Sequence, residues 1–559
     1  MRITAIPQIY RHLNRWGEIL AVLSKYGLAN WIGRLGPEFA KDILKARCGD
    51  SIARLSWATR VRLALGELGP TFVKLGQLLS TRPDLVGVAL AAELEQLQTN
   101  AQADPSDTIR ATIERELGRK LEDLFGQFDE QPLASASIGQ VHGAVLHSGE
   151  HVVVKVQHAD ILWRVEVDLD ILSGLAHLAE RIPEFQNYRP QAVVAEFQRS
   201  LRRELDFTRE QRNIQQFAVQ LAGNPNLRLP RPYPALSSQR VLTMQRLDGI
   251  KLSDVERLRA AGVDLDAVAR RGAEICLEMI FDHGFYHADP HPGNILVLDQ
   301  GVIGLLDFGM VGRIDESLHD DIGEMLIALG NQDAEHLTSL ILRVASAPSS
   351  LDRATFCLEV TDFIAHYGNQ PLERFDLGGA LREIVELIRR YRIMLPARIA
   401  MLLKALITLE GTARMLSPKF SLVEVMSPYR RTLIWRGLSP RRRLRKFRRI
   451  YSEFEHLLGL LPRGIIEIFE QVRSGKFDVH LDHRGLEPSV NRLVLGMLAS
   501  AMMLGSSILL GCSVPPTFSF ELLGAHNISA LGAAGLVVSL GMGLRLWRAI
   551  NKSGRLDRR

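Results

Sequence analysis

The chain has 559 residues, of which 46% are hydrophobic and 23% charged, a composition typical of a folded protein with room for about three or four domains. Its formal net charge of +5 is mildly basic, so the overall balance leaves both nucleic acid and anionic lipid open as partners. Four scattered cysteines form no CxxC pair, which argues against a structural zinc site or a disulfide framework and fits a reducing compartment.

Residues 1–125 are predicted to form a basic helical extension. Near its start, apolar side chains recur at helical spacing, and these are Tyr10, Leu13, Trp16, Ile19 and Leu20. Such a stripe can rest on a membrane surface, but it more often packs against its own domain, which is our expectation. No long apolar segment opens the chain, so no secretory signal peptide is expected.

Residues 68–86 predict a short helix, because Gly69-Pro70 breaks the preceding helix and Arg82-Pro83 ends this one. Lys74 and Gln77 stand in its otherwise apolar sequence. From the pattern alone, Lys74 is a lysine that extends its amino group to solvent. Residues 88–125 predict two more helices, with Ser106-Asp107 as the cap of the second.

Residues 126–250 change to strand patterns. A hairpin at Ser148-Gly149 joins two strands, the second of which carries Lys155 in VVVKVQ. In kinases a lysine at this point of the third strand pairs with the α- and β-phosphates, and a glycine-rich loop covers the phosphates. Alanine replaces glycine in the corresponding loop here, which restricts the backbone. The nucleotide-binding prediction therefore covers Ala134, Ser135, Ala136, Ser137, Ile138, Gly139 and Lys155.

A helical run at 197–221 carries three acids, Glu204, Asp206 and Glu210. The kinase fold needs a glutamate there to hold the strand lysine, and Glu210 is our candidate. The alternative is that all three acids pair with neighbouring arginines on a solvated helix face. Residues 241–249 predict a strand that leads into a hinge, where the backbone from Met244 onward would face adenine, and residues 266–285 predict an amphipathic helix.

The stretch HADPHPGN…DFG, residues 287–309, carries the strongest chemical signal. Kinases place an aspartate and an asparagine five residues apart, followed by Asp-Phe-Gly. Asp289, Asn294 and Asp307 match this frame. Asn294 and Asp307 would supply the oxygen ligands that Mg²⁺ prefers, and Asp289 would orient or deprotonate the nucleophile. A turn-rich β-hairpin without chemistry is the alternative.

Residues 251–425 are predicted to complete a second, mostly helical lobe. The apolar run at 382–415 is interrupted by Pro396, Arg398 and Lys404, so we expect a buried helix pair rather than a membrane span. Residues 426–490 form a juxtamembrane region with ten basic residues and no acid between 427 and 450. An anionic membrane surface is favoured over nucleic acid as its partner because a membrane segment follows; a solvated basic helix is the plain alternative.

Residues 491–559 predict a transmembrane helical hairpin with a basic tail. The apolar runs 493–512 and 528–544 are separated by Pro515-Pro516, and Lys and Arg lie only beyond their outer ends. This asymmetry places both termini in the cytoplasm. The small residues of these runs favour close helix packing or a homodimer; a soluble buried hairpin is the alternative.

With these residues, the chain resembles the UbiB family of atypical kinase-like proteins, also called the ADCK family, from about residue 63 to 416. It carries the family's KxGQ motif at Lys74–Gln77, the alanine-rich loop at 134–137, the ExD motif at Glu204 and Asp206, and HADPHPGN and DFG. The membrane pair is similar to that of the bacterial UbiB branch. The resemblance implies that the KxGQ segment folds across the active site and that Lys74 meets the two ExD acids, so Lys74, Gln77, Glu204 and Asp206 are regulatory candidates.

We therefore expect an α+β, bilobal protein-kinase-like domain with an N-terminal helical extension and a C-terminal transmembrane hairpin. The resemblance implies ATP and Mg²⁺ as cofactors, ATP hydrolysis, and support of ubiquinone biosynthesis at the bacterial inner membrane. Expected partners are quinone precursor lipids or phenolic head groups and the enzymes of that pathway, with no nucleic acid. The alternatives are a phosphotransferase acting on a protein or small molecule and a non-enzymatic lipid-binding scaffold.

Overall fold

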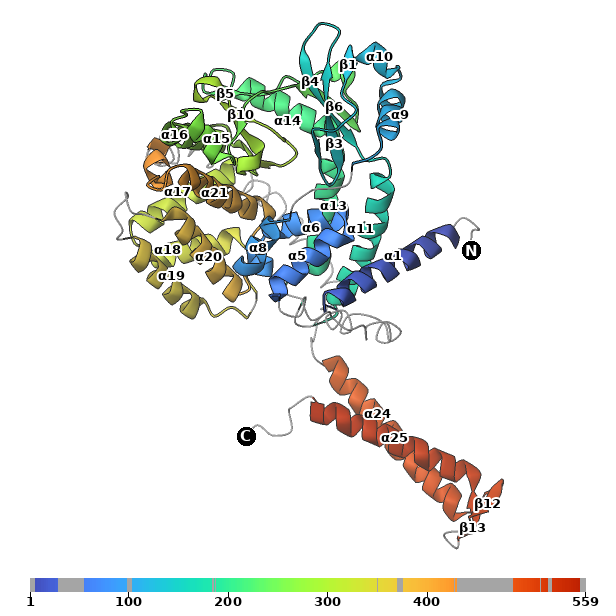
Figure 1. Cartoon of the computed structure of the whole chain (residues 1–559). Coiled ribbons are helices and arrows are strands. Elements are labelled where there is room, and N and C mark those ends of the chain that lie inside the picture. Colours follow the sequence, from blue (N-terminus) through green and yellow to red (C-terminus); the bar gives the residue numbers. More distant parts are fainter. Residues whose placement is uncertain are drawn as a thin grey trace, which may run out of the picture. The chain divides into compact units, whose positions relative to one another are not determined.

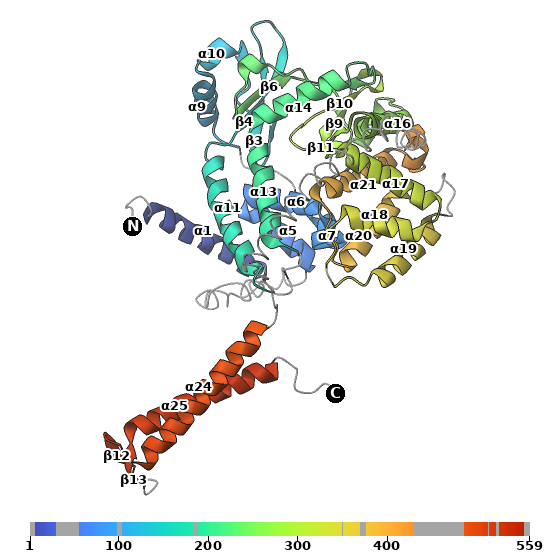
Figure 2. The same ribbon diagram turned by 180° about the vertical axis from the view of Figure 1, so that it is seen from behind.

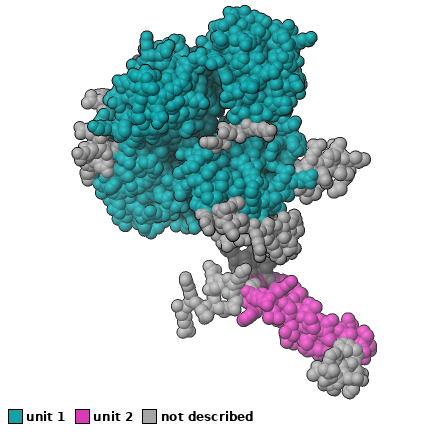
Figure 3. Space-filling view, viewed as in Figure 1, with its two compact units in different colours: residues 1–445 teal, residues 446–559 magenta. Residues whose placement is uncertain are grey.

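The computed structural model separates into two compact units, Met1–Arg445 and Lys446–Arg559 (Figure 3). Each is described by itself. Most of the predicted juxtamembrane region 426–490, including the basic cluster, lies outside the described residues. The structure describes residues 6–28, 55–97, 103–182, 185, 188–348, 350–368, 376–426, 428–429, 486–512, 514–520 and 525–552.

A five-stranded antiparallel sheet forms the first lobe (Figure 1). Its central strands follow from alternation, because Val152, Val154 and Val156 point to one face and are fully buried while Lys155 points to the other. The sheet order is β1-β3-β4-β6, with β2 paired to β3. The strands are β1 (Gln127–Phe128), β2 (Ala134–Ser135), β3 (Gly139–Val145), β4 (His151–Gln157) and β6 (Val241–Gln245).

Helices cover both faces of this sheet. On one face, α9 (Ser106–Leu117) and α10 (Leu121–Leu124) pack their apolar residues against the three buried valines. On the other face, α14 (Phe207–Gln220) packs Phe217 and Ile214 into the main core with strand residues of β6. The sheet thus lies between two apolar layers, and Lys155 emerges from the side that carries α14.

The single helical run predicted at 197–221 is wrong, because this stretch belongs to two helices. α13 (Pro190–Glu204) ends at Leu205, and Asp206 caps α14 by accepting a hydrogen bond of 3.1 Å from the backbone N–H of Thr208. The capping aspartate is the local signal for the break. Before α13 lies α11 (Ile161–Ala179).

The second lobe carries the loops of the predicted active site. A small sheet has the order β5-β10-β9-β7, and β8 pairs with β11 beside it. The helix predicted at 266–285 is shorter: it is followed by a single π-helical segment, Glu278–His283, before β8 begins. The elements are β5 (Leu227–Arg228), η2 (Pro234–Leu236), β7 (Ile250–Lys251), α15 (Val255–Ala260), α16 (Leu265–Leu277), β8 (Phe285–His287), η4 (Pro292–Asn294), β9 (Ile295–Val297), η5 (Asp299–Gly301), β10 (Ile303–Leu305) and β11 (Val311–Arg313).

Five helices complete this lobe, most of them begun by an aspartate. The side chains of Asp315, Asp333, Asp352 and Asp376 each accept a backbone N–H at a helix start. Among the described residues, the apolar helix pair predicted at 382–415 is indeed part of the protein core. The helices are α17 (Glu316–Gly330), α18 (Ala334–Val344), α19 (Arg353–Tyr367), α20 (Leu377–Arg390) and α21 (Ala397–Leu416).

The N-terminal extension packs on both α11 and the second lobe (Figures 1 and 2). Arg15 pairs with the buried carboxylate of Asp168 at 2.7 Å, so the first helix lies on its own domain as predicted. Between residues 88 and 125 there are three helices rather than two, and Pro105, not Ser106, precedes α9. The extension contains α1 (Ile6–Lys25), α5 (Trp57–Leu68), α6 (Pro70–Ser80), α7 (Pro83–Val86) and α8 (Val88–Glu95).

A buried arginine fixes the end of the extension to the second lobe. Arg82 pairs with Asp84 at 2.8 Å and donates to the carbonyl of Leu395 at 3.1 Å. Both charged side chains are almost fully buried, so the pair needs these partners to offset the loss of hydration. The α6–α7 break is therefore a rigid contact to α20 and α21 rather than a free linker.

The second unit is a pair of long helices, α24 (Leu486–Gly511) and α25 (Ala530–Lys552). Their segments Arg492–Gly511 and Ala530–Arg548 are long and apolar enough to cross a membrane. The second helix begins two residues later than the apolar run suggested, because Ile528 belongs to a strand. A hairpin of β12 (Thr517–Phe520) and β13 (Ala525–Ser529) lies between the helices, where only a loop was expected.

Small residues set the packing of this helix pair, in part as predicted. A Cβ on Gly535 would lie 2.2 Å from the Ser506 hydroxyl oxygen, and one on Gly532 would lie 3.1 Å from the Ser506 carbonyl. Both glycines therefore permit close contact with α24. Gly505 and Gly511 face open space within this chain.

Candidate active site

A large cavity of about 1470 Å³ lies between the lobes of the first unit. The first lobe contributes the loop 136–139 and Lys155, and the second contributes the catalytic stretch at 287–294 and Asp307. The extension forms a further wall through α5, α6 and α8. The predicted residues that line it are Lys74, Gln77, Ala136, Ser137, Ile138, Gly139, Lys155, Glu204, Glu210, Asp289, Asn294 and Asp307.

Lys155 and Glu210 meet on the floor of this cavity. The lysine amino group lies 2.8 Å from Oε2 of Glu210 and 3.0 Å from Oε1, and it also lies 3.6 Å from Oδ1 of Asp307. Glu210 has a buried side chain and accepts the backbone N–H of Phe308 at 3.3 Å. Of the three acids considered, Glu210 is thus the one that holds the strand lysine.

The Asp-Phe-Gly segment is held from below by packing. Phe308 is fully buried and packs against Phe217 of α14, while Asn213 donates to its carbonyl at 2.9 Å. Asp307 has a φ of 47°, a left-handed conformation that is uncommon for a residue with a side chain. This conformation directs its half-exposed carboxylate to the cavity, beside Lys155.

The charges of this cluster reinforce each other. The charge of Lys155 lowers the pKa of Asp307 well below its ordinary value, against the opposing effect of burial and with a further contribution from Lys74. Burial opposes the charge of Lys155, but the carboxylates of Asp307 and Glu210 outweigh it and raise the lysine pKa. At neutral pH the cluster holds a charged lysine and a fully ionised Asp307, the form that a metal ligand requires.

The catalytic loop is held by backbone contacts to the same segment. Nε2 of the buried His287 donates to the carbonyl of Asp307 at 2.7 Å, and its Nδ1 accepts the backbone N–H of Asp289 at 3.3 Å. These partners define the tautomer that carries its proton on Nε2. Asn294 donates to the Asp289 carboxylate at 3.3 Å, which leaves the amide oxygen of Asn294 as a ligand.

The alanine-rich loop divides between a strand and the cavity wall. Ala134 and Ser135 belong to β2 and pair with Val141 and Gln140, so the cavity-lining part begins at Ala136. Gly139 is required for packing, since a Cβ there would lie 2.3 Å from the carbonyl oxygen of Val156.

One hydroxyl group in this loop suits a phosphate. The side-chain oxygens of Ser135 and Ser137 are both buried, and no hydrogen-bond partner is found for them among the described residues, but of the two only Ser137 lines the cavity. Buried hydroxyl groups are normally paired, and a phosphate oxygen would accept from Ser137. Together with Lys155, Ser137 fits a nucleotide triphosphate.

Met244 occupies a different environment from the rest of the predicted set. It is buried in the main core and does not line the cavity, and its backbone pairs with Val153 across the sheet. Gln245 directs its N–H to the carbonyl of Arg231 at 2.8 Å. A backbone contact to adenine would therefore come from residues just after β6, not from Met244 itself.

The KxGQ lysine reaches one of its two expected partners. Lys74 forms an ion pair with Glu204, which lies near Gly309. Asp206 instead caps α14 and lies 3.6 Å from Arg209, so the expectation that Lys74 meets both acids is corrected. Gln77 lines the same cavity, one helical turn away.

A metal ion here would depend on the nucleotide as well as on the protein. Within the ranges that the structure describes, no group of three or more His, Cys, Asp or Glu side chains forms a metal site. Mg²⁺ commonly binds through one or two protein oxygens together with phosphates and water. Asn294 and Asp307 fit that need, and they would hold Mg²⁺ only with a bound nucleotide.

Sequence reasoning missed three side chains of this cavity. Lys404 from α21 lies 3.9 Å from Asp289, Glu95 of α8 lines the same wall, and Arg62 of α5 pairs with Glu93 beside it. The sequence does mark Lys404 as unusual, since it is a lone lysine in an apolar helix. The cavity that its side chain reaches, however, depends on how α21 packs.

Three family models match this chain. They are the ABC1 atypical kinase-like domain at residues 96–341, the UbiB helical domain at 360–421 and the ABC1/UbiB kinase-like C-terminal domain at 480–552.

Individual proteins are also similar to this chain. The chain is 34% identical over 430 residues to the "Probable protein kinase UbiB" of Pseudomonas aeruginosa, covering 75% of this chain and 79% of that protein. It is 30% identical to an "Uncharacterized protein in hydrogenase 1 5'region" of Clostridium pasteurianum, covering 89% and 93%. A solved structure of Rv3197 with erythromycin from Mycobacterium tuberculosis aligns at 21% identity and a TM-score of 0.46, covering 66% and 94%. On the family models and the similarity to the Pseudomonas protein, the chain belongs to the ABC1/UbiB family of atypical kinase-like proteins.

Proposed function

We propose that this protein is a membrane-anchored ATPase of the kinase-like type that supports ubiquinone biosynthesis. The observation that carries the ATPase part is the cluster of Lys155, Glu210 and Asp307 beside Asp289 and Asn294 in one cavity. This arrangement provides positioning and charge stabilisation, which make up most of the catalysis of phosphoryl transfer.

The residues take distinct roles in this proposal. Mg-ATP supplies the phosphoryl group and the divalent cation. Lys155, fixed by Glu210, would bind the phosphates, and Asn294 and Asp307 would hold the cation by their oxygens. Asp289 would orient water for attack. The Ser137 hydroxyl would donate to phosphate from the loop above.

Two features favour water over a protein as the acceptor. The Lys74–Glu204 ion pair places α6 beside the Asp-Phe-Gly segment, on the side where a protein acceptor would dock in a kinase. Both side chains are only about one-fifth exposed, so the contact covers the site closely. Water and small molecules would still enter the cavity.

A phosphotransferase is the alternative function, and the alanine-rich loop offers its test. We expect Ala136→Gly, which changes the cavity-lining loop, to alter ATP affinity and permit some autophosphorylation, because glycine restores backbone freedom. We expect the same direction for Ala134→Gly, but a smaller change, since that residue pairs with Val141 in β2. Autophosphorylation is measured with radiolabelled ATP, and equal labelling of both variants and wild type would contradict this role of the loop.

Lys74→Ala tests the extension. Removal of the lysine should leave the fold intact, because the side chain is at the cavity wall, but it should change turnover by about threefold or more through the loss of an ion pair in a poorly hydrated site. A steady-state ATPase assay measures the change, and Lys25→Ala, which removes an exposed ion pair with Glu67, is the control. Equal turnover in both variants would contradict a regulatory role for Lys74.

Membrane anchoring rests on the second unit. Its apolar side chains are widely exposed, for example Leu504 at 68% and Val537 at 71%, as in helices that face lipid rather than water. Lys and Arg lie only at the outer ends of the two apolar segments. We therefore propose that both termini and the kinase-like domain lie on the cytoplasmic side of the bacterial inner membrane.

Topology reporters test this arrangement. Fusions at the C-terminus and near Met1 should read as cytoplasmic, and one within residues 513–527 should read as external. A cytoplasmic signal from the 513–527 fusion, or release of the full chain by a salt wash, would contradict the hairpin.

The link to ubiquinone rests on the resemblance to UbiB at 34% identity. Quinone precursor lipids with phenolic head groups, and the enzymes that modify them, are the proposed partners. The test of the enzymatic proposal is Mg-ATP turnover by the full chain in detergent, with and without a phenolic quinone precursor. Turnover that depends on Mg²⁺ is the expected result, and its absence in both conditions would overturn the proposal.

A further inference from the structure

Lys404 is the cation of α21 that reaches into the active-site cavity. Its amino group lies 3.9 Å from Oδ1 of Asp289 and donates to the hydroxyl oxygen of Ser80 at 3.4 Å. Only 14% of its side chain is exposed. The lysine therefore touches the catalytic loop and the end of the extension helix α6 at once.

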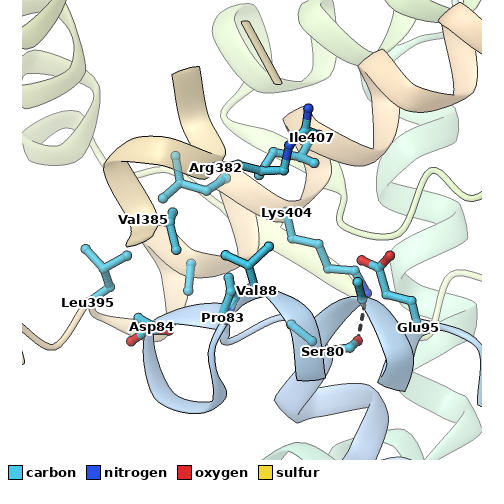
Figure 4. Close-up of a pocket in the computed structure, with 14 residues that line it drawn as sticks. Ser80, Pro83, Asp84, Val88, Glu95, Arg382, Val385, Leu395, Lys404 and Ile407 are labelled. Atoms are coloured by element: carbon cyan, nitrogen blue, oxygen red, sulfur yellow. Dashed lines mark hydrogen bonds between the residues drawn. The ribbon is translucent and has the colours of Figure 1, made fainter. Parts of the chain in front are cut away.

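The stem of this lysine borders a small, mostly apolar pocket. A pocket of about 200 Å³ lies between α7–α8 and α20–α21, and Lys404 forms part of its wall with Val88, Leu403 and Ile407 (Figure 4). Figure 4 shows the amino end directed to Ser80, beside the carboxylate of Glu95. The lysine thus lays its stem along apolar surface and presents its amino group to polar partners.

The catalytic loop provides no cation of its own. Residues 289–294 read DPHPGN, without Lys or Arg. Elsewhere in the described cavity wall, Lys155 pairs with Glu210, Lys74 with Glu204 and Arg62 with Glu93. Among the lysines and arginines that line this cavity, Lys404 has the ion-pair distance to Asp289.

The two oxygens of Asp289 then have separate partners. Asn294 donates to Oδ2 at 3.3 Å, and Lys404 approaches Oδ1. A carboxylate with a partner on each oxygen keeps one orientation. A fixed orientation of Asp289 would hold the attacking water in line with the phosphate, and such positioning strongly affects the rate.

We propose that Lys404 is the positioning residue of Asp289, and that it links the catalytic carboxylate to the extension through Ser80. Lys404, from a helix distant in sequence, supplies the positive charge that the loop 289–294 lacks. The inference rests on the proposed ATPase function. We expect an effect on the chemical step rather than on nucleotide binding, because among the described residues Lys404 forms its ion pair with Asp289 and its hydrogen bond with Ser80, not with Lys155, Asn294 or Asp307.

The test compares Lys404→Met, Lys404→Arg and Arg398→Met in the full chain. Met keeps the apolar stem, Arg keeps the charge, and Arg398 lies on the same helix but pairs with Asp315 outside the cavity. For Lys404→Met we expect kcat to fall about tenfold or more, with KM for Mg-ATP within about twofold of wild type. Lys404→Arg should recover most of the rate, and Arg398→Met should match wild type.

A double variant separates a local effect from a general one. In the Asp289→Asn background, Lys404→Met should cause no further loss of the residual rate, because its partner is already absent. A wild-type kcat for Lys404→Met, or an equal fractional loss in both backgrounds, would overturn the inference. Lack of turnover by wild type itself would instead overturn the proposed function, and Mg-ATP thermal shift of each variant checks that the nucleotide site is intact.

Discussion

Asp307→Asn is expected to abolish Mg²⁺-dependent nucleotide binding and to reduce ATP turnover by about a hundredfold or more. The variant removes a charged oxygen ligand from a hard cation, and it removes the carboxylate that faces Lys155 at 3.6 Å. The expected readout is loss of the thermal shift caused by Mg-ATP and loss of turnover, each measured over a range of Mg²⁺ concentrations.

Asp315→Asn is the matched control, because this aspartate caps α17 and pairs with Arg398 away from the cavity. It should retain the Mg-ATP shift and nearly wild-type stability, because asparagine caps a helix about as well as aspartate and the lost ion pair with Arg398 is exposed. Unchanged Mg-ATP affinity and turnover in Asp307→Asn would remove the metal assignment.

Lys155→Met is expected to be both inactive and unstable. Removal of the amino group leaves the carboxylates of Glu210 and Asp307 near each other without their cation, and breaking a buried pair from one side costs about 3–5 kcal/mol. Because the side chain of Lys155 is 19% exposed and that of Asp307 is 53% exposed, the lower end of that range applies. Chemical denaturation measures the loss.

A double variant identifies the cause of the instability. Lys155→Met with Glu210→Leu removes both charges of the most buried pair, so it should regain part of the stability that Lys155→Met loses while staying inactive. If the double variant were less stable than wild type by the full sum of the two single losses, the ion pair would not be the source of the effect.

The catalytic frame was predictable because its chemistry fixes its spacing. Asp289 and Asn294 belong to one loop, and Asp307 follows a strand pair whose length is short, so sequence distance alone brings them close. Lys155 was predictable for a similar reason, since alternation in VVVKVQ places it opposite the buried valines. The sequence alone does not distinguish Glu210 from Glu204 and Asp206 as the partner of Lys155. The distinction depends on the break between α13 and α14 at Leu205.

The remaining errors come from contacts between distant parts of the chain. Asp206 was assigned to Lys74, but its local role as a helix cap satisfies it. In the sequence Lys404 is only an interruption of an apolar run, since its partners come from the placement of α21 beside Ser80 of α6 and the catalytic loop. The strands of the 513–527 segment were missed because no alternating pattern of sufficient length marks them.

The central claim is that the γ-phosphate of ATP goes to water and not to protein. The most direct measurement is the distribution of label from radiolabelled ATP after incubation with the full chain in detergent, Mg²⁺ and a generic protein substrate. We expect that nearly all released label appears as inorganic phosphate, and Asp307→Asn serves as the inactive control. Efficient labelling of the added protein by wild type would contradict it and identify a protein kinase.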